Sequence, residues 1–318
     1  MNQSILYVGL DVDDTQYHGS ALSQATGEVL HFQCYGDSAM FRSRALKLLF
    51  LLFIIVPTVA SGYSTQKHNS ETMVADLFYD RGKSNLKPII LLPGSEGGKA
   101  WSKRKKIIKK LVEKDFAVLS LTYHRMNHLP KNLVRIPVVE YINNAIKFMK
   151  ELDFTSDGEV TLLGISRGGE LGLLIASLNQ NVGAVVALVP SAYVVPGFDP
   201  NRKKGLPMSG WSLKGEEIPY IQWAGMTLVQ AVEQTSDNEK EAARIKVENI
   251  NGPILCISGK KDKLWDSTYM CNLIQKQLQI SGYGHPYKHV VIDGSGHYVT
   301  RSSKTWKNVY EFLDGALQ

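Results

Sequence analysis

The stretch LLGISRGGELGLL, from Leu162 to Leu174, contains the pattern Gly-x-Ser-x-Gly at Gly164, Ser166 and Gly168. It directly follows an apolar run and directly precedes a helical pattern, which is the arrangement of a serine held on a sharp strand-to-helix turn. Glycines flank the serine because strand and helix approach too closely there for side chains. The hydroxyl then lies at the amino end of a helix, whose dipole favours developing negative charge. The stretch predicts a nucleophilic serine at position 166.

Apolar runs alternate with helical patterns along the chain after Gly62. The runs are PIILLP from Pro88, FAVLSLTY from Phe116, EVTLLGI from Glu159, GAVVALV from Gly183, PILCIS from Pro253 and KHVVID from Lys288. The helical patterns cover residues 101–114 and 137–151, a stretch beginning at Gly168, and residues 266–281 and 303–316. Continuous apolar strands separated by helices are typical of a parallel sheet covered on both faces. We therefore predict an α/β fold of the α/β-hydrolase type for residues 62–318.

Two segments depart from this alternation. The run ADLFYD, from Ala75, leads through RGKSN into PIILLP and predicts a hairpin before the first crossover. The stretch 190–237 is rich in Gly, Pro and Trp. A long irregular segment inside a compact domain is often functional, so we expect an insertion or lid over the site.

A nucleophilic serine needs a base, and the base needs an orienting acid. In α/β hydrolases the acid and then the histidine follow the serine along the chain. Asp262 stands just past the strand PILCIS, and His297 stands just past the strand KHVVID in a glycine-bounded loop. We expect Ser166, Asp262 and His297 to form a catalytic triad.

Other residues compete for the roles of base and acid. His285 precedes the last strand and His289 lies within it, so both are expected to face solvent or to pack structurally. Asp266 lies in the same loop as the favoured acid, and Asp293 is close enough in sequence to orient the histidine locally. The loop after the preceding strand is the usual position of the acid, which favours Asp262.

Acyl transfer also requires two amide donors for the oxyanion. One is expected from the N–H of Arg167, the residue after the nucleophile. The second is expected from the loop PGSEGG, residues 93–98, where glycines allow the backbone to turn an N–H inward. Ser95 and Glu96 are equal candidates for this second donor. The chemistry uses side chains and backbone alone, so we expect no metal and no cofactor.

From roughly Pro88 to Thr300 the chain resembles the carboxy-terminal α/β-hydrolase domain shared by acyl-CoA thioesterases and bile acid-CoA:amino acid N-acyltransferases. The matching stretches are KDFAVLSLTYH with the later HLPK, GISRGGELGLLIAS, the Asp and Trp of GKKDKLWDS, and SGHY. The resemblance implies a Ser/Cys–Asp–His triad, which falls on Ser166, Asp262 and His297. It also implies hydrolysis of a fatty acyl thioester.

The nucleophile separates two activities within this family. Members that transfer the acyl group to an amino acid use cysteine in the elbow, whereas serine suggests transfer to water. We therefore expect a serine hydrolase of acyl thioesters, acting through an acyl-serine. The alternatives are a carboxylesterase or dienelactone hydrolase-like enzyme, an amino acid N-acyltransferase, and a non-catalytic binding protein on a hydrolase scaffold. The family usually carries a β-sandwich before this domain, and the roughly 27 residues between Ser61 and Pro88 are too few to form one.

The amino-terminal part of the chain differs in charge from the rest. The whole sequence carries a net charge of +6, yet residues 1–39 contain five acidic residues and no lysine or arginine. Predicted strands in SILYVGLDV, DDTQYHGSALSQ and GEVLHFQCY form a small β-meander. This segment resembles the start of an insertion-element transposase with an RNase H-like fold, in which Asp11 would be the first metal-binding acid. A lone aspartate does not make a two-metal site, so we interpret residues 1–39 as an inert remnant or an unremarkable extension.

Residues 40–61 have the layout of a secretory signal. A positive region from Met40 precedes LLFLLFIIV, residues 48–56, and small residues at Ala60 and Ser61 could accept cleavage. A membrane helix needs about 20 apolar residues, and this run meets a proline after nine. If the signal is cleaved, we expect the protein to be secreted or periplasmic. An uncleaved anchor, with membrane contact through residues 48–60, or a buried segment would make it membrane-associated or cytoplasmic.

Other features bear on partners. The stretch WSKRKKIIKKL from Trp101 could bind phosphate groups of coenzyme A, nucleic acid or an anionic membrane. Its apolar residues share one helical face, which also fits an ordinary solvated helix. No nucleic-acid fold signature accompanies it, so we expect a small-molecule ester or thioester as the partner. Cys256 and Cys271 are read as core thiols, with pairing as the alternative in an oxidising compartment.

Overall fold

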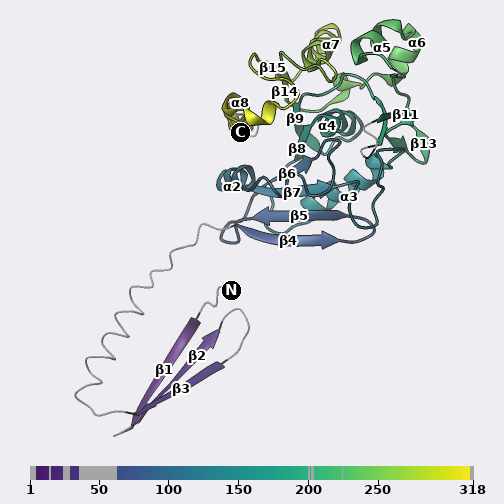
Figure 1. Ribbon diagram of the computed structural model, residues 1–318. Coiled ribbons are helices and arrows are strands. Elements are labelled where there is room, and N and C mark those ends of the chain that lie inside the picture. The colour runs from purple at the N-terminus through teal and green to yellow at the C-terminus, as the bar shows by residue number, and fades with distance from the viewer. Residues whose placement is uncertain are drawn as a thin grey trace. The chain divides into compact units, whose positions relative to one another are not determined.

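The computed structural model describes residues 5–13, 16–23, 29–35, 63–199, 201, 204–223 and 225–315. The chain forms two compact units, Met1–Ser61 and Gly62–Gln318, which we call unit 1 and unit 2. Unit 1 contains a three-stranded antiparallel sheet in the order β1-β2-β3, which confirms the predicted meander (Figure 1). Its strands are β1 (Ile5–Asp13), β2 (Gln16–Ser23) and β3 (Val29–Tyr35). The proposed signal at residues 40–61 lies outside the described residues.

Unit 2 is built on an eight-stranded sheet in the order β15-β14-β9-β8-β6-β7-β5-β4. The strands are β4 (Ser64–Asn69), β5 (Val74–Tyr79), β6 (Lys87–Leu92), β7 (Phe116–Thr122), β8 (Val160–Ile165), β9 (Val182–Leu188), β14 (Ile254–Gly259) and β15 (Tyr287–Ile292). The six strands from β6 onward run parallel, and the β4–β5 hairpin adds antiparallel strands at one edge. This topology confirms the predicted α/β-hydrolase fold.

The predicted hairpin between residues 75–80 and 88–93 is wrong. β5 pairs antiparallel with β4 and with β7, and β7 separates it from β6. The helical crossover after β6 returns the chain as a parallel strand, and this strand occupies the edge of β6 that a hairpin would need. The true partner, β4, has the polar sequence STQKHN and is largely exposed. It therefore lacks the apolar signal of a strand.

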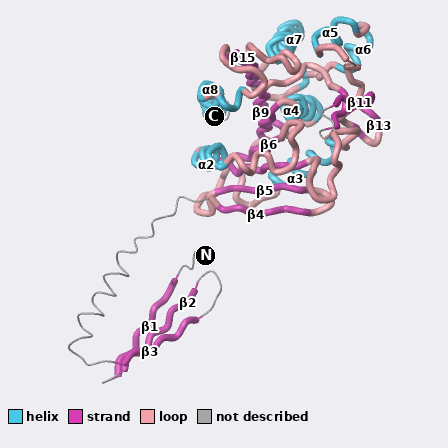
Figure 2. The backbone as a smooth tube through the Cα atoms, in the orientation of Figure 1, coloured by secondary structure: helices cyan, strands magenta, loops and turns pink. Residues whose placement is uncertain are grey.

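Helices cover both faces of the sheet (Figures 1 and 2). α2 (Lys105–Glu113) and α8 (Ser303–Gly315) pack on one face, whereas α3 (Val138–Lys150), α4 (Arg167–Leu178) and α7 (Ser267–Ile280) pack on the other. Successive residues of the central strands alternate between the two cores. In β6, Ile89 and Leu91 face α2 and α8, whereas Ile90 and Leu92 face the other helices. The five predicted helices are confirmed.

The segment 190–237 is an insertion between β9 and β14. It contains two short hairpins and a helix: β10 (Pro196–Asp199), β11 (Lys204–Ser209), β12 (Ser212–Leu213), β13 (Glu216–Glu217) and α5 (Leu228–Gln234). Bridges between Leu133 and Phe198 and between Ile136 and Trp211 join it to the loop before α3. α6 (Asp237–Ala243) and the turn η1 (Val247–Asn249) lead back to β14. The predicted insertion is confirmed, and its role as a lid stays a prediction.

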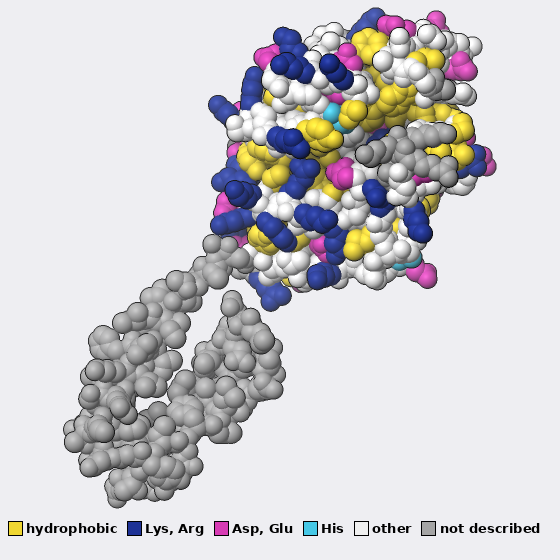
Figure 3. All heavy atoms as spheres, viewed as in Figure 1, with side chains coloured by type: hydrophobic (Ala, Val, Ile, Leu, Met, Phe, Trp, Pro, Cys, Tyr) yellow, Lys and Arg dark blue, Asp and Glu magenta, His cyan; other side chains and the backbone are white. Residues whose placement is uncertain are grey.

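The surface of unit 2 carries charge of both signs. On the face shown in Figure 3, lysine and arginine side chains are dispersed and interleaved with acidic ones, and apolar side chains gather in a band. α2 buries Ile108, Leu111 and Val112, while its lysines lie toward solvent, so its two faces separate as predicted. Within the described ranges, no helix combines the length and apolar character needed to cross a membrane.

Candidate active site

Ser166 lies on the turn between β8 and α4, with a backbone φ of 56°. This left-handed conformation is unusual for a residue with a side chain and marks a strained turn. The two glycines permit it. A Cβ added to Gly164 would lie 1.9 Å from the carbonyl oxygen of Gly168, and a Cβ added to Gly168 would lie 2.2 Å from the carbonyl oxygen of Leu92. Both positions therefore require glycine.

Three loops bring the predicted triad together. His297 Nε2 lies 2.8 Å from Ser166 Oγ, and His297 Nδ1 lies 2.8 Å from Asp262 Oδ2. A carboxylate only accepts hydrogen bonds, so Nδ1 of the imidazole carries the proton that it donates to Asp262. In a neutral ring Nε2 is then an acceptor for the hydroxyl of Ser166. This protonation state is the one in which a histidine can act as a base toward serine.

Asp262 is held as a buried carboxylate. Its side chain is fully buried beneath His297 and also accepts a hydrogen bond from the backbone N–H of Leu264 at 3.0 Å. Burial acts to raise the pKa of Asp262, but hydrogen bonds and the charge interaction with His297 outweigh it and lower the pKa below its ordinary value. The carboxylate is therefore ionised at neutral pH, as an orienting acid needs to be.

Trp265 supports the histidine from the side. Its ring packs edge-on against the imidazole of His297 at 5.3 Å between centroids, and its Nε1 donates to the carbonyl of Val189 at 3.1 Å. Trp265 is buried, so it restricts the directions in which the imidazole can rotate. In the sequence this tryptophan is part of the matching stretch GKKDKLWDS, and the structure shows it packed against His297.

The rival residues have other contacts. His289 lies within β15 and Nε2 of its ring is 2.8 Å from the hydroxyl of Ser258, while His285 packs against the ring of Tyr283. Asp266 caps α7 through the backbone N–H of Tyr269. Asp293 is exposed and pairs with Lys260 at 3.4 Å.

The loop after β6 packs directly on the elbow. A Cβ added to Gly94 would lie 3.3 Å from Cβ of Ser166, so this loop passes at van der Waals distance from Ser166. Ser95 and Glu96 follow immediately. The N–H of Gly97 donates to the carbonyl of Gly94, which leaves the choice of the second oxyanion donor between Ser95 and Glu96, as the sequence left it.

The end of β7 holds this loop by its carbonyl groups. Tyr123 Oη donates to the carbonyl of Pro93, and His124 Nε2 lies 3.4 Å from the carbonyl oxygen of Ser95. Burial lowers the pKa of His124 to about 4, so its ring is neutral at pH 7. The C=O and N–H of a trans peptide point in opposite directions. Fixing the carbonyl of Ser95 therefore also fixes the direction of the N–H of Glu96.

Arg167 contributes more than the backbone group expected of it. Its guanidinium is buried beside the carboxylate of Glu170 at 2.8 Å and beneath the ring of Trp211. Burial raises the pKa of Glu170 to about 7, and the charge of Arg167 opposes that shift. No role was assigned from the sequence to Tyr123, to His124 or to the side chains of Arg167 and Glu170. Their signal was present, since TYH and RGGE belong to the quoted stretches, but a motif does not show which side chains turn inward.

The described part of the chain was also expected to lack a metal site, and its cysteines bear on that point. Cys256 and Cys271 are buried free thiols. Among the described residues, no group of three or more His, Cys, Asp or Glu side chains is arranged to hold a metal ion.

The chain matches the model of one protein family, described as BAAT / acyl-CoA thioester hydrolase C terminal, over residues 138–302. The match includes the elbow, the acid and the histidine. The chain belongs to this family. The resemblance of residues 1–39 to a transposase stays a prediction.

Curated relatives include thioesterases from mammals. The chain is 28% identical over 189 residues to the mouse mitochondrial acyl-coenzyme A thioesterase 2, and this alignment covers 59% of the chain and 40% of the relative. It is 26% identical over 184 residues to the mouse peroxisomal succinyl-coenzyme A thioesterase, covering 58% of the chain and 43% of the relative. The chain thus spans about two fifths of the length of these relatives.

Solved structures confirm the fold alone. A putative dienelactone hydrolase from Klebsiella pneumoniae superposes with a TM-score of 0.52 at 14% identity, over 80% of this chain and 96% of that one. An α/β hydrolase from a Penicillium species superposes with a TM-score of 0.54 at 16% identity, over 79% and 96%. These superpositions agree with the α/β-hydrolase fold of the eight-stranded sheet and its helices.

The close packing around Gly168 leads us to predict that Gly168→Ala is destabilising. The added methyl group collides with backbone, which cannot rotate away, so we expect a loss of about 1–3 kcal/mol in unfolding free energy, measured by urea titration. Gly284→Ala is the matched control, because a Cβ there meets nothing within 4 Å. Equal stability of the two variants would contradict the close approach.

Because folding lowers the pKa of Asp262, we predict that this residue makes the unfolding free energy depend on pH. A carboxyl whose pKa is lowered by folding contributes stability above its unfolded pKa, near 3.9, and this contribution is lost as the pH falls through the folded value. We expect the difference in unfolding free energy between the wild type and Asp262→Asn to be constant near neutrality and to shift against the wild type below about pH 4. A difference that shifts in favour of the wild type on acidification would show that burial dominates instead.

Proposed function

We propose that this protein is a serine hydrolase of acyl thioesters, with Ser166 as the nucleophile. The observation that carries the proposal is the pair of 2.8 Å contacts that join Ser166 to His297 and His297 to Asp262. Membership of the thioester hydrolase family supports the substrate class.

In the first half of the reaction the acyl group moves to the enzyme. Ser166 Oγ attacks the carbonyl carbon while Nε2 of His297 takes its proton, and Asp262 stabilises the resulting imidazolium. The tetrahedral intermediate collapses as the carbon–sulfur bond breaks. His297 returns the proton to the leaving thiol, and the acyl group remains as an ester of Ser166.

The oxyanion of the intermediate is bound by backbone. The N–H of Arg167 lies in the first turn of α4, where a helix leaves its amide groups without carbonyl partners. The N–H of Ser95 or Glu96 supplies the second donor from the loop that packs on the elbow. Each such donor is worth about 3 kcal/mol by analogy with measured oxyanion holes.

Water completes the cycle. His297 removes a proton from a water molecule, the resulting hydroxide attacks the acyl-serine, and the carboxylic acid leaves as Ser166 is reprotonated. The serine in place of cysteine supports hydrolysis over transfer to an amine, because an oxygen ester is less reactive toward amines than a thioester. Coenzyme A as the thiol carrier is proposed from the names of the curated relatives.

The compartment is proposed from residues 40–61. Translation from Met40 and cleavage near Ala60 would give a secreted or periplasmic enzyme. Mass spectrometry of the mature amino terminus tests this step, and a mature chain that begins before residue 40 would exclude it.

The nucleophile assignment predicts the behaviour of Ser166→Ala. The wild type should react with a fluorophosphonate probe at one site, and the variant should show no labelling while keeping its fold by circular dichroism. Ser281→Ala, which removes a hydroxyl that donates to the carbonyl of Leu278, is the control and should label like the wild type. Labelling that persists in Ser166→Ala would exclude this serine as the nucleophile, and an unlabelled wild type would favour a binding protein.

The substrate class predicts the ranking of substrates. Acyl-CoA thioesters of several chain lengths, assayed with a thiol reagent, should give kcat/KM values above those of p-nitrophenyl esters of the same acids. Because the same triad serves both, Ser166→Ala should abolish both activities. Turnover of esters alone would favour the carboxylesterase or dienelactone hydrolase-like alternative.

A further inference from the structure

The first turn of α4 contains a buried ion pair directly after the nucleophile. The side chains of Arg167 and Glu170 are 3% and 0% exposed, and their charged atoms lie 2.8 Å apart. Neither side chain takes part in the reaction proposed above.

Both side chains contact the insertion. Glu170 Oε1 accepts hydrogen bonds from Nε1 of Trp211 at 2.8 Å and from the N–H of Val195 at 3.2 Å. Arg167 Nη1 donates to the carbonyl of Val195 at 3.2 Å, and the guanidinium lies 4.6 Å from the centroid of the Trp211 ring. Gly210 leaves room for it, since a Cβ there would lie 2.0 Å from Arg167 Nη2. The first turn of α4 and the insertion are therefore bonded through one buried cluster.

Stability alone is a poor explanation for this cluster. A buried ion pair is often matched or exceeded in stability by apolar residues of similar volume. Here the pair also leaves Nε and Nη2 of Arg167 buried without a hydrogen-bond partner, which costs free energy. The pair does restrain the position of Arg167, and the backbone N–H of this residue is the proposed oxyanion donor.

We propose that Arg167, Glu170 and Trp211 form a cluster, which we call the clasp. The clasp fixes the position of the backbone N–H of Arg167, the proposed oxyanion donor, relative to the insertion. The clasp rests on the proposed function, since it acts through the oxyanion hole of Ser166. Glu170 and Trp211 are positioning residues, which act through the backbone of Arg167. Loosening the clasp displaces an amide that is needed most in the transition state, so kcat falls and KM changes little.

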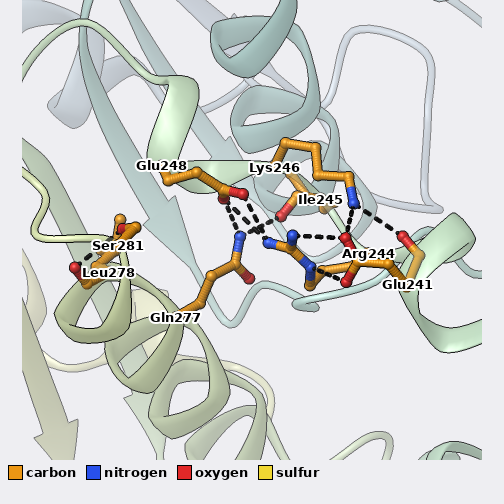
Figure 4. A network of polar contacts seen from close by, with 8 residues as sticks. All are labelled: Glu241, Arg244, Ile245, Lys246, Glu248, Gln277, Leu278 and Ser281. Carbon is orange, nitrogen blue, oxygen red and sulfur yellow. Dashed lines mark hydrogen bonds and ion pairs between the residues drawn. The ribbon is translucent and has the colours of Figure 1, made fainter. Parts of the chain in front are cut away.

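A second arginine–glutamate cluster offers a matched control (Figure 4). Arg244 donates to both carboxylate oxygens of Glu248 at 3.0 Å, and Gln277 also donates to Glu248. Like Glu170, Glu248 thus accepts from one arginine and one further side chain. It lies after the insertion in the turn η1, which is close to α4, but its hydrogen bonds to Arg244 and Gln277 involve no side chain of the clasp. Glu248→Gln therefore makes the same carboxylate-to-amide change in a cluster outside the clasp.

The experiment compares Glu170→Gln, Trp211→Phe and Glu248→Gln in the full chain. The readouts are the second-order rate of fluorophosphonate labelling and kcat per labelled site with the best substrate. We expect Glu170→Gln to lower both by about tenfold or more, with KM within about twofold, because a displaced donor loses part of the 10²–10³ effect of removing one. Trp211→Phe, which removes the N–H donor and part of the buried ring but leaves the carboxylate of Glu170, should show a smaller loss in the same direction. Glu248→Gln should retain the wild-type rates.

The outcomes separate the clasp from a merely structural pair. Wild-type kcat per labelled site in both clasp variants, even with a lower melting temperature, would overturn the proposal. An equal loss of kcat in Glu248→Gln would overturn it too. If Glu170→Gln does not fold, Trp211→Phe decides alone, because it keeps an aromatic side chain at position 211 and the carboxylate of Glu170. An unlabelled wild type would instead count against the proposed function itself.

Discussion

The close approach of β8 and α4 at two glycines is the constraint on which the site depends. Without side chains at Gly164 and Gly168, the helix begins within van der Waals distance of two strand ends, and Ser166 is forced to a positive φ. That strained turn projects the hydroxyl from the sheet edge toward His297. The free energy that maintains it comes from the packing of the surrounding sheet and helices, whose core residues are almost completely buried.

The parallel sheet explains why distant residues meet. β8, β14 and β15 run in the same direction, so the loops that follow them emerge at one edge and carry Ser166, Asp262 and His297. The order of strands and helices could be predicted because the buried strands are continuous apolar runs. The triad could be placed at strand ends for the same reason. The antiparallel edge could not, because β4 is polar and because β5 pairs with β7, which lies far along the chain, and not with β6.

The supports of the site were harder to predict than its reacting groups. Tyr123 and His124 hold the oxyanion loop by its carbonyls, and Trp211 reaches Glu170 across 41 positions of sequence. No periodicity indicates such contacts, because each depends on where a side chain points after the sheet has formed. The insertion could be predicted from its irregular composition. Its link to α4 could not, because that link consists of the buried contacts of Arg167 and Glu170. The chain belongs to the BAAT / acyl-CoA thioester hydrolase C-terminal family, and these supports explain how this particular sequence arranges the candidate site.

The most direct measurement is a crystal structure of the protein after reaction with a fluorophosphonate. The phosphorus is predicted to be bonded to Ser166 Oγ, with its phosphoryl oxygen within hydrogen-bond distance of the N–H of Arg167 and of one amide in residues 95–96. Nε2 of His297 should remain near the bonded oxygen. An adduct on another residue, or a phosphoryl oxygen turned to solvent with neither amide in reach, would contradict the account.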